Sequence, residues 1–247
     1  HIKKVRICVK KLQMNQIITQ HGWGLDKSIW KELKSKFSLN NWFWQDNDRG
    51  YFSNFTNNSQ WKNSNKDESI KLVISHSLGT HLIEPEILHK ASHLVLINSF
   101  QNFIPLNTKR NKTIRTLKRM EKKLENLESN LVLTEFIYRA FQPNAIDKNL
   151  QNFLNNKLNK INTHLLLKDF KKLFVEEKPN KLISTSCNVL ILKSKNDLIL
   201  EENSCDNFTE FLNQSQIIRP KLIELKNQEN ILNNLDIFKL ISKWLDL

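Results

Sequence analysis

The sequence of 247 residues predicts an α/β fold in which helices flank a mostly parallel central sheet and a helical cap is inserted near the middle of the chain. Short apolar runs alternate with helical patterns in residues 1–99 and again in 182–247, which is typical of parallel strands joined by helical crossovers. Residues 100–181 lack such runs and have the pattern of long charged helices. We therefore expect a core domain made of 1–99 and 182–247, with 100–181 as the cap.

Two strands are expected before residue 50. Residues 17–20 form an apolar run that ends in the turn 21–24. Residues 26–37 then place their apolar side chains at helical spacing, and residues 42–44 form a second short strand that a turn closes. This order of strand, helix and strand is the first parallel crossover.

Two further strands are expected before the cap. Residues 70–74 have the clearest strand pattern, and they run directly into the turn 75–79. A helix to about residue 89 and a strand at 94–97 follow. The same crossover pattern therefore repeats.

The cap is expected to be amphipathic, since apolar residues in its first half share one helical face among many lysines and arginines. That face consists of Ile114, Leu117, Leu124, Leu127 and Leu131. After the cap, strands at 188–192 and 222–225 alternate with helices at 203–212 and 235–245. These elements complete the predicted sheet.

The turn Ser75-His76-Ser77-Leu78-Gly79 is the strongest candidate for a catalytic element. A sharp strand-to-helix turn of the type Gly-x-Ser-x-Gly strains its central serine, points Oγ outward and aims the first helical amides at whatever Oγ attacks. Here Ser75, a small residue, replaces the first glycine, and Gly79 stands where a Cβ would crowd the preceding strand. The pattern predicts that Ser77 is a nucleophile beside half of an oxyanion hole. An ordinary helix N-cap serine is the alternative.

A second turn with two glycines follows the first strand, where Gly22 and Gly24 flank Trp23. Such a turn at the carboxyl end of a strand can point a backbone N–H towards the same cleft and supply the second oxyanion donor. A simple tight turn is the alternative. The chain contains only four glycines, and three of them lie in these two turns, which strengthens the functional interpretation.

The formal net charge is +13, which raises the question of nucleic-acid binding. No recognition motif accompanies this charge, and the sequence is rich in Asn, Lys and Ile and poor in Gly and Ala, as AT-rich coding produces. We therefore expect a solvated basic surface or an acidic protein partner, and no nucleic acid.

Neither a membrane span nor a secretory signal is predicted. No run approaches the roughly 18 apolar residues that a span requires, and the first ten residues are charged throughout. The three cysteines, Cys8, Cys187 and Cys205, lack metal-type spacing and fit reduced thiols. We expect a cytoplasmic monomer with no metal and no cofactor.

On these residues the sequence resembles the α/β-hydrolase superfamily, and within it the pimeloyl-acyl-carrier-protein methyl ester esterases of biotin synthesis. The resemblance is carried by 21–25 with Trp30, by 75–79 and by 189–199. The order of elements is similar to that of the superfamily over nearly the whole chain. The cap is similar in position and helical content only.

The resemblance implies that the chain is a serine esterase. Ser77 attacks a carboxylic ester, the amides of Trp23 and Leu78 bind the oxyanion, and Asp197 orients a histidine base. Asp197 has support of its own, because it follows the strand 188–192 by a few residues, where such sheets place their catalytic acid. An aspartate in a surface loop is the alternative.

The histidine that the resemblance requires is missing. It should lie in the loop 225–231, where Gln228 occupies the expected position and Asn227 is the alternative. A neutral amide cannot accept the serine proton, and losing a triad member lowers kcat by about 10⁴- to 10⁶-fold. Of the other histidines only His164, in the cap, has the freedom to act as a base, and an ordinary cap histidine is the alternative.

Two functions therefore remain open. One is hydrolysis of a small acyl ester, for which the resemblance suggests the methyl ester of pimeloyl-acyl-carrier protein. The other is a catalytically impaired relative that binds an acyl or carrier-protein ligand in the same cleft.

The cap supplies the candidate binding residues for both functions. A cluster on one helix would steer and dock an acidic carrier protein, namely Arg115, Lys118, Arg119 and Lys122. We expect Phe136, Tyr138 and Arg139 to line an acyl channel with Trp23. Packing of that cap helix on the core is the alternative.

Overall fold

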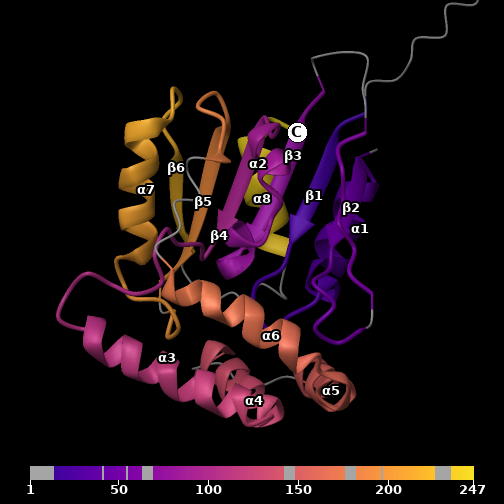
Figure 1. Ribbon diagram of the computed structural model, residues 1–247. Helices are drawn as coiled ribbons and strands as arrows, with labels where there is room; N and C mark the ends of the chain where they lie inside the picture. The colour runs from indigo at the N-terminus through magenta and orange to yellow at the C-terminus, as the bar shows by residue number, and fades with distance from the viewer. Residues whose placement is uncertain are drawn as a thin grey trace, which may run out of the picture.

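The computed structural model describes residues 14–40, 42–53, 55–62, 69–141, 148–175, 182–195, 197–225 and 235–247. Within these ranges six strands form one sheet in the order β2-β1-β3-β4-β5-β6, and every neighbouring pair is parallel (Figure 1). The strands are β1 (Gln16–Gln20), β2 (Phe43–Asn47), β3 (Lys71–His76), β4 (His93–Ile97), β5 (Asn188–Ser194) and β6 (Lys221–Leu225). The predicted α/β fold with a mostly parallel sheet is confirmed.

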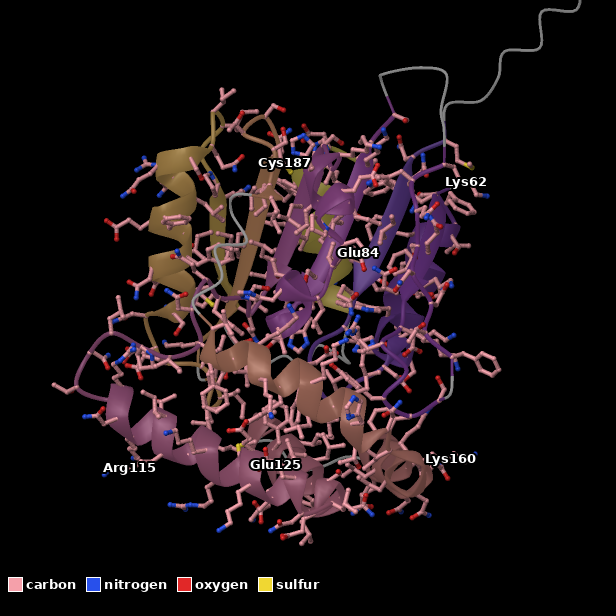
Figure 2. All side chains as sticks on the ribbon, viewed as in Figure 1. Lys62, Glu84, Arg115, Glu125, Lys160 and Cys187 are labelled. Carbon is pink, nitrogen blue, oxygen red and sulfur yellow. The ribbon has the colours of Figure 1, made fainter. Side chains whose placement is uncertain are left out.

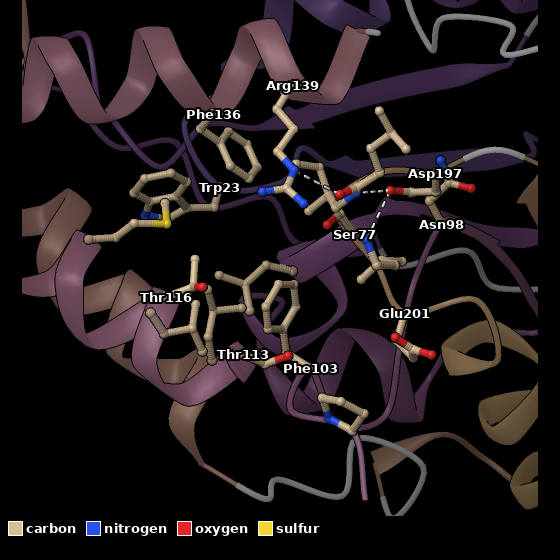
Figure 3. Close-up of a pocket in the computed structure, with 18 of the residues that line it drawn as sticks. Trp23, Ser77, Asn98, Phe103, Thr113, Thr116, Phe136, Arg139, Asp197 and Glu201 are labelled. Carbon is tan, nitrogen blue, oxygen red and sulfur yellow. Dashed lines mark hydrogen bonds between the residues drawn. The ribbon is translucent and has the colours of Figure 1, made fainter. Parts of the chain in front are cut away.

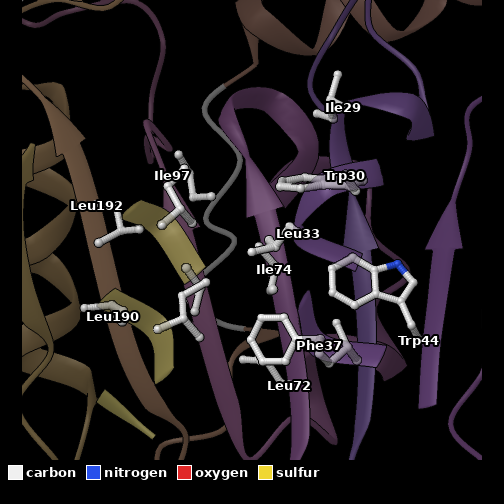
Figure 4. Packing of buried hydrophobic residues seen from close by; sticks show 14 of the residues in the cluster. Ile29, Trp30, Leu33, Phe37, Trp44, Leu72, Ile74, Ile97, Leu190 and Leu192 are labelled. Carbon is white, nitrogen blue, oxygen red and sulfur yellow. The ribbon is translucent and has the colours of Figure 1, made fainter. Parts of the chain in front are cut away.

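The central strands are apolar on both faces because helices cover the sheet on both sides. Side chains alternate along β3, so that Leu72 and Ile74 join one apolar cluster while Val73 joins another. The first cluster packs against α1 (Lys31–Ser38) and α8 (Leu235–Trp244) (Figure 4). The second packs against α2 (Pro85–His89) and α7 (Ser204–Ser215). This burial fixes the register of the strands and so the positions of the loops at their ends.

The segment after the turn at Ser77 differs from the prediction of one continuous helix to residue 89. A 3₁₀ helix, η2 (Ser77–His81), comes first, and α2 begins only at Pro85. Proline disfavours helical backbone at the residue before it, and Glu84 is accordingly extended, with φ −59° and ψ 133°. A similar split precedes α1, where η1 (Lys27–Trp30) comes first.

Four helices between β4 and β5 lie across the carboxyl ends of the strands (Figure 1). They are α3 (Arg110–Glu125), α4 (Ser129–Phe141), α5 (Lys148–Lys157) and α6 (Thr163–Phe170), with the 3₁₀ helices η3 (Leu158–Lys160) and η4 (Lys171–Phe174). Side chains from these helices and from the sheet project into the space between them (Figure 2). None of the helices in the described ranges is long and apolar enough to cross a bilayer. The division into core and cap domains at residues 99 and 182 stays a prediction.

The apolar face predicted for the first half of the cap is shorter than expected. Leu117 and Leu124 are buried, but Leu127 is 78% exposed. The reason is local, because α3 ends at Glu125 and Leu127 has a φ of +64°, which interrupts the helical spacing. Leu131 belongs to the next helix and is also exposed.

A buried ion pair joins α6 to the loop after β2. The carboxylate of Asp169, which is fully buried, accepts hydrogen bonds from Nε and Nη2 of Arg49 at 2.8 and 2.7 Å. It also accepts one from the hydroxyl of Tyr51 at 2.8 Å. Burial raises the pKa of Tyr51 well above its ordinary value, and Asp169 raises it further, so the phenol stays a donor. This cluster holds α6 against the core.

Candidate active site

The turn between β3 and η2 places Ser77 in a strained conformation. Its φ is +53°, in the left-handed region that a residue with a side chain rarely adopts, while the preceding His76 is still extended. Strain of this kind persists only where the surroundings impose it, and it concentrates at functional sites. No group in the described ranges hydrogen-bonds to the Ser77 hydroxyl, which lies in a cavity.

Two glycines allow this turn to pack against the turn that follows β1. A Cβ at Gly79 would lie 2.8 Å from the carbonyl oxygen of Gln20. A Cβ at Gly22 would lie 2.9 Å from Nδ1 of His76, the residue before Ser77. Both contacts are too close for a side chain, so glycine is required at both positions. The two predicted oxyanion turns therefore meet at the carboxyl ends of neighbouring strands.

A cavity of about 760 Å³ lies between α3, α4 and the carboxyl ends of the strands (Figure 3). Its lining includes four of the residues for which the sequence predicts catalytic or oxyanion roles, namely Ser77, Leu78, Trp23 and Asp197. The indole of Trp23 packs edge-on against Phe136 of α4 at 5.1 Å between ring centroids. This wall is apolar, as expected for an acyl group.

Asp197 lies in the loop after β5, where backbone amides hold its carboxylate. Oδ1 accepts hydrogen bonds from the amides of Ile199 at 2.7 Å and Leu200 at 2.9 Å. Burial raises the pKa of Asp197, the two amides lower it, and the net pKa lies above its ordinary value. Among the residues that the structure describes, no side chain donates a hydrogen bond to this carboxylate. One oxygen is therefore available to a further partner.

Replacing Asp197 by Asn is expected to stabilise the protein at neutral pH. The pKa of Asp197 is higher in the folded than in the unfolded protein, so ionisation of this carboxyl favours the unfolded chain. The resulting loss of stability is absent at low pH and grows as the pH rises through the two pKa values. Asn keeps an acceptor for the two amides and carries no charge. Thermal unfolding should show a Tm higher by about 2–4 °C at pH 7 and a smaller difference at pH 4. An unchanged Tm difference across this range would contradict the assigned cause.

Asn98 is a lining residue that the sequence did not single out. It directly follows β4 and has a φ of +44°. Its Oδ1 accepts from the amide of Ser194 at 2.8 Å, and its Nδ2 donates to the Ser194 hydroxyl at 3.0 Å. These bonds join the ends of β4 and β5 directly before the loop of Asp197. An asparagine after a predicted strand was the available signal, since Asn tolerates this backbone region better than most residues.

None of the histidines in the described ranges lines the cavity with Ser77. His164 is exposed on α6, so the structure does not support it as a base from the cap. His76 is adjacent to Ser77, but its Nδ1 is buried with no hydrogen-bond partner among the described residues, and burial lowers its pKa to about 3. Gln228 and Asn227, at the predicted position of the base, lie outside the described residues.

His21 is occupied by structural hydrogen bonds. Its Nδ1 lies 2.8 Å from the carbonyl oxygen of Gly22, which can only accept, so Nδ1 carries the proton. Its Nε2 accepts from the amide of Arg49 at 3.1 Å. Both nitrogens of His21 are thus used to hold the turn after β1.

The predicted acyl-channel residues of α4 divide into two groups. Phe136 and Arg139 line the cavity, but Tyr138 does not and is 44% exposed. On an α-helix residues three apart share a face, whereas Tyr138 points about 200° away from Phe136. The prediction for Tyr138 as a lining residue is corrected accordingly.

The predicted docking cluster is exposed on α3, where Figure 2 labels Arg115. Its members are Arg115, Lys118, Arg119 and Lys122, of which Arg119 also borders the cavity. No structural feature shows what this face binds. Its docking role stays a prediction.

Cys205 also lines the cavity, but its environment excludes a nucleophilic thiolate. Burial raises the pKa of this thiol to about 12, and Sγ lies 3.3 Å from the carbonyl oxygen of Ser99. No group of three or more potential metal ligands comes together within the described residues.

No protein-family model and no curated protein sequence matches the chain. Solved structures match over nearly its full length. A bromoperoxidase from Bacillus anthracis has a TM-score of 0.68 at 12% identity, covering 94% of this chain and 90% of that one. An esterase from Exiguobacterium antarcticum has a TM-score of 0.66 at 14% identity, with 95% and 92% covered. The enol-lactonase from Burkholderia xenovorans LB400 has a TM-score of 0.64 at 10% identity, with 96% and 94% covered. At these identities the likeness shows a shared fold.

Proposed function

We propose that this chain, which has the α/β-hydrolase fold, is a carboxylic-ester hydrolase with Ser77 as its nucleophile. The observation that carries the proposal is the strained Ser77, which lies in a cavity that Asp197 and an apolar wall also line. A residue held at a φ of +53° by two closely packed glycine turns is hard to explain as a purely structural serine. An esterase and a lactonase among the structural neighbours favour acyl–oxygen cleavage.

The reaction would proceed through an acyl-enzyme. Oγ of Ser77 forms a bond to the ester carbonyl carbon, and the carbonyl oxygen takes the negative charge. The amides of Leu78 and Trp23 would donate to this oxyanion. The carbon–oxygen bond to the alcohol then breaks, and the alcohol leaves with the proton that the Ser77 hydroxyl gave up. Water next attacks the acyl carbon, the acid is released, and a proton from that water returns to Oγ of Ser77.

For the substrate we propose the methyl ester of pimeloyl-acyl-carrier protein in biotin synthesis. The support is the sequence resemblance together with two features of the cap. Arg119, one residue of the exposed basic face of α3, borders the cavity, so an acidic carrier docked on that face would lie near the cavity mouth. The wall of Trp23 and Phe136 suits an aliphatic acyl chain.

A second candidate, a catalytically impaired relative, is favoured by one specific observation. No histidine in the described part of the chain lines the cavity, and Gln228 stands at the position where the base is expected. Without a base, the strained serine and the cavity would still bind an acyl ligand, but turnover would fall by several orders of magnitude.

Labelling with a fluorophosphonate tests the role of Ser77. We expect the wild-type protein to be labelled on Ser77, as peptide mass spectrometry would show, and Ser77→Ala to lower the labelling rate by at least about 10³-fold. Ser194→Ala is the matched control, because Ser194 lines the same cavity but is bonded to Asn98. A hydrolase is excluded if the wild-type protein resists labelling as fully as Ser77→Ala does.

A further inference from the structure

The cavity that contains Ser77 is basic. Seven lysines and arginines line it against four carboxylates. Three of these cations have acidic partners: Lys109 with Glu201 at 2.9 Å, Lys123 with Glu135 at 3.0 Å, and Lys193 with Asp206 at 2.6 Å. The other four have no carboxylate at ion-pair distance within the described ranges, namely Lys112, Arg119, Arg139 and Lys195. The cavity therefore attracts anions.

Arg139 differs from the other three because a hydrogen bond fixes its guanidinium. Its Nε donates to the carbonyl oxygen of Leu198 at 3.1 Å, and Leu198 is the residue after Asp197. All four side chains are exposed, but among the described residues no hydrogen bond holds the charged ends of Lys112, Arg119 and Lys195. Of these four cations, Arg139 is thus the one whose guanidinium a described hydrogen bond orients for a ligand.

The fixed guanidinium points into the part of the cavity that holds the candidate catalytic groups. Figure 3 shows Arg139, Ser77 and Asp197 directed into the same space. Because Nε is used by Leu198, the two Nη groups remain, and no group in the described ranges accepts from them. Two parallel N–H donors of this kind match the two oxygens of a carboxylate.

We propose that Arg139 binds a free carboxylate of the substrate, so that the cavity selects monoesters of dicarboxylic acids over neutral esters. This inference rests on the proposed ester hydrolysis at Ser77, since it places the ester group there and the second carboxylate at Arg139. It does not extend to the carrier-bound methyl ester proposed above, because both carboxyl groups of that pimeloyl chain are esterified and neither is free. A neutral acyl chain bound here would cover the Nη groups without supplying an acceptor, which is unfavourable. The remaining cations of the rim add long-range attraction for the same anionic group.

Binding to the Ser77→Ala protein tests the inference without requiring turnover. Calorimetry would compare monomethyl adipate, which carries one free carboxylate, with dimethyl adipate, which has the same chain and no charge. We expect the anionic ester to bind about 10- to 100-fold more tightly. Arg139→Gln should remove this preference. Arg219→Gln, which removes the same charge from an exposed position outside the cavity, should retain it.

Equal affinity for the two esters would overturn the inference. So would an equal loss of preference in Arg139→Gln and Arg219→Gln, since the effect would then be that of net charge alone. The two proposals can fail separately. If the wild-type protein resists fluorophosphonate but prefers the anionic ester in a way that depends on Arg139, the anion site is supported and the hydrolase proposal is excluded. If Ser77 is labelled but the two adipate esters bind equally well, the hydrolase proposal is supported and the anion site is excluded.

Discussion

For the catalytically impaired relative, replacing Gln228 by histidine is expected to raise ester turnover at Ser77 by about 10³- to 10⁴-fold. The described residues supply a strained serine and a buried carboxylate, but no histidine in the cavity. An imidazole can take the proton of the serine hydroxyl, which the amide of glutamine cannot. The group that these residues lack is thus an acceptor for the Ser77 proton, and the substitution Gln228→His supplies one.

Gln228 follows the end of β6 by only three residues in the sequence. Leu225 at the end of β6 is the register partner of Ser194 at the end of β5. Asp197 follows Ser194 by three residues, and Gln228 follows Leu225 by three. Three residues span at most about 10 Å, so the chain length after this strand pair allows a histidine at 228 to approach the carboxylate that would orient it.

The measurement is kcat/KM with a p-nitrophenyl ester for the wild-type protein and for Gln228→His. The double variant Gln228→His with Ser77→Ala should return to background, which shows that any gain acts through Ser77. Asn227→His tests the alternative position. The prediction is wrong if neither histidine variant gains activity, or if the wild-type protein already turns over at ordinary enzyme rates of about 1–10³ s⁻¹.

Replacing Asp169 by Ala is expected to lower the free energy of unfolding by about 3 kcal/mol. The carboxylate is fully buried and accepts from both Arg49 and Tyr51. Without this carboxylate, the largely buried guanidinium of Arg49 and the phenol of Tyr51 lose their acceptor. The free-energy cost of leaving these two groups unpaired is larger than the net stabilisation that the intact ion pair contributes. The loss should also loosen α6 against the core.

Guanidinium denaturation measures this effect through the midpoint and the slope. Glu86→Gln is the control, because Glu86 forms an ion pair with Lys90 on the exposed surface at 2.6 Å. We expect the control to leave the midpoint unchanged. Equal shifts for the two variants would show that the buried cluster does not hold the cap helix.

Much of the core could be predicted from local patterns. The strand at 70–74 is visible as a short apolar run, and Gly79 is visible as a rare residue two positions after Ser77. Both signals lie within ten consecutive residues. Predictions failed where a local detail interrupted a pattern. Pro85 divides the helix after the turn, and Leu127 ends the apolar face of α3.

The residues that complete the cavity were harder to predict because their faces depend on packing. Phe136 and Arg139 were expected there and line it, but Tyr138 points elsewhere on the same helix. Asn98 was not expected, since its role comes from bonds to Ser194, 96 residues away in the sequence. To predict from the sequence which helical residues line a cavity, one must know which side of the helix packs against the core.

The sequence by itself determined the parallel sheet, the strained serine turn and the place where a histidine is absent. These follow from apolar alternation, from the steric demand for glycine and from position along the chain, all of which are local. Only the tertiary structure decided that Arg139 is fixed by Leu198 and that Asp169 holds Arg49. These bonds join residues 59 and 120 positions apart, and they form because the helices after β4 fold back over the carboxyl ends of the strands, which no local pattern encodes.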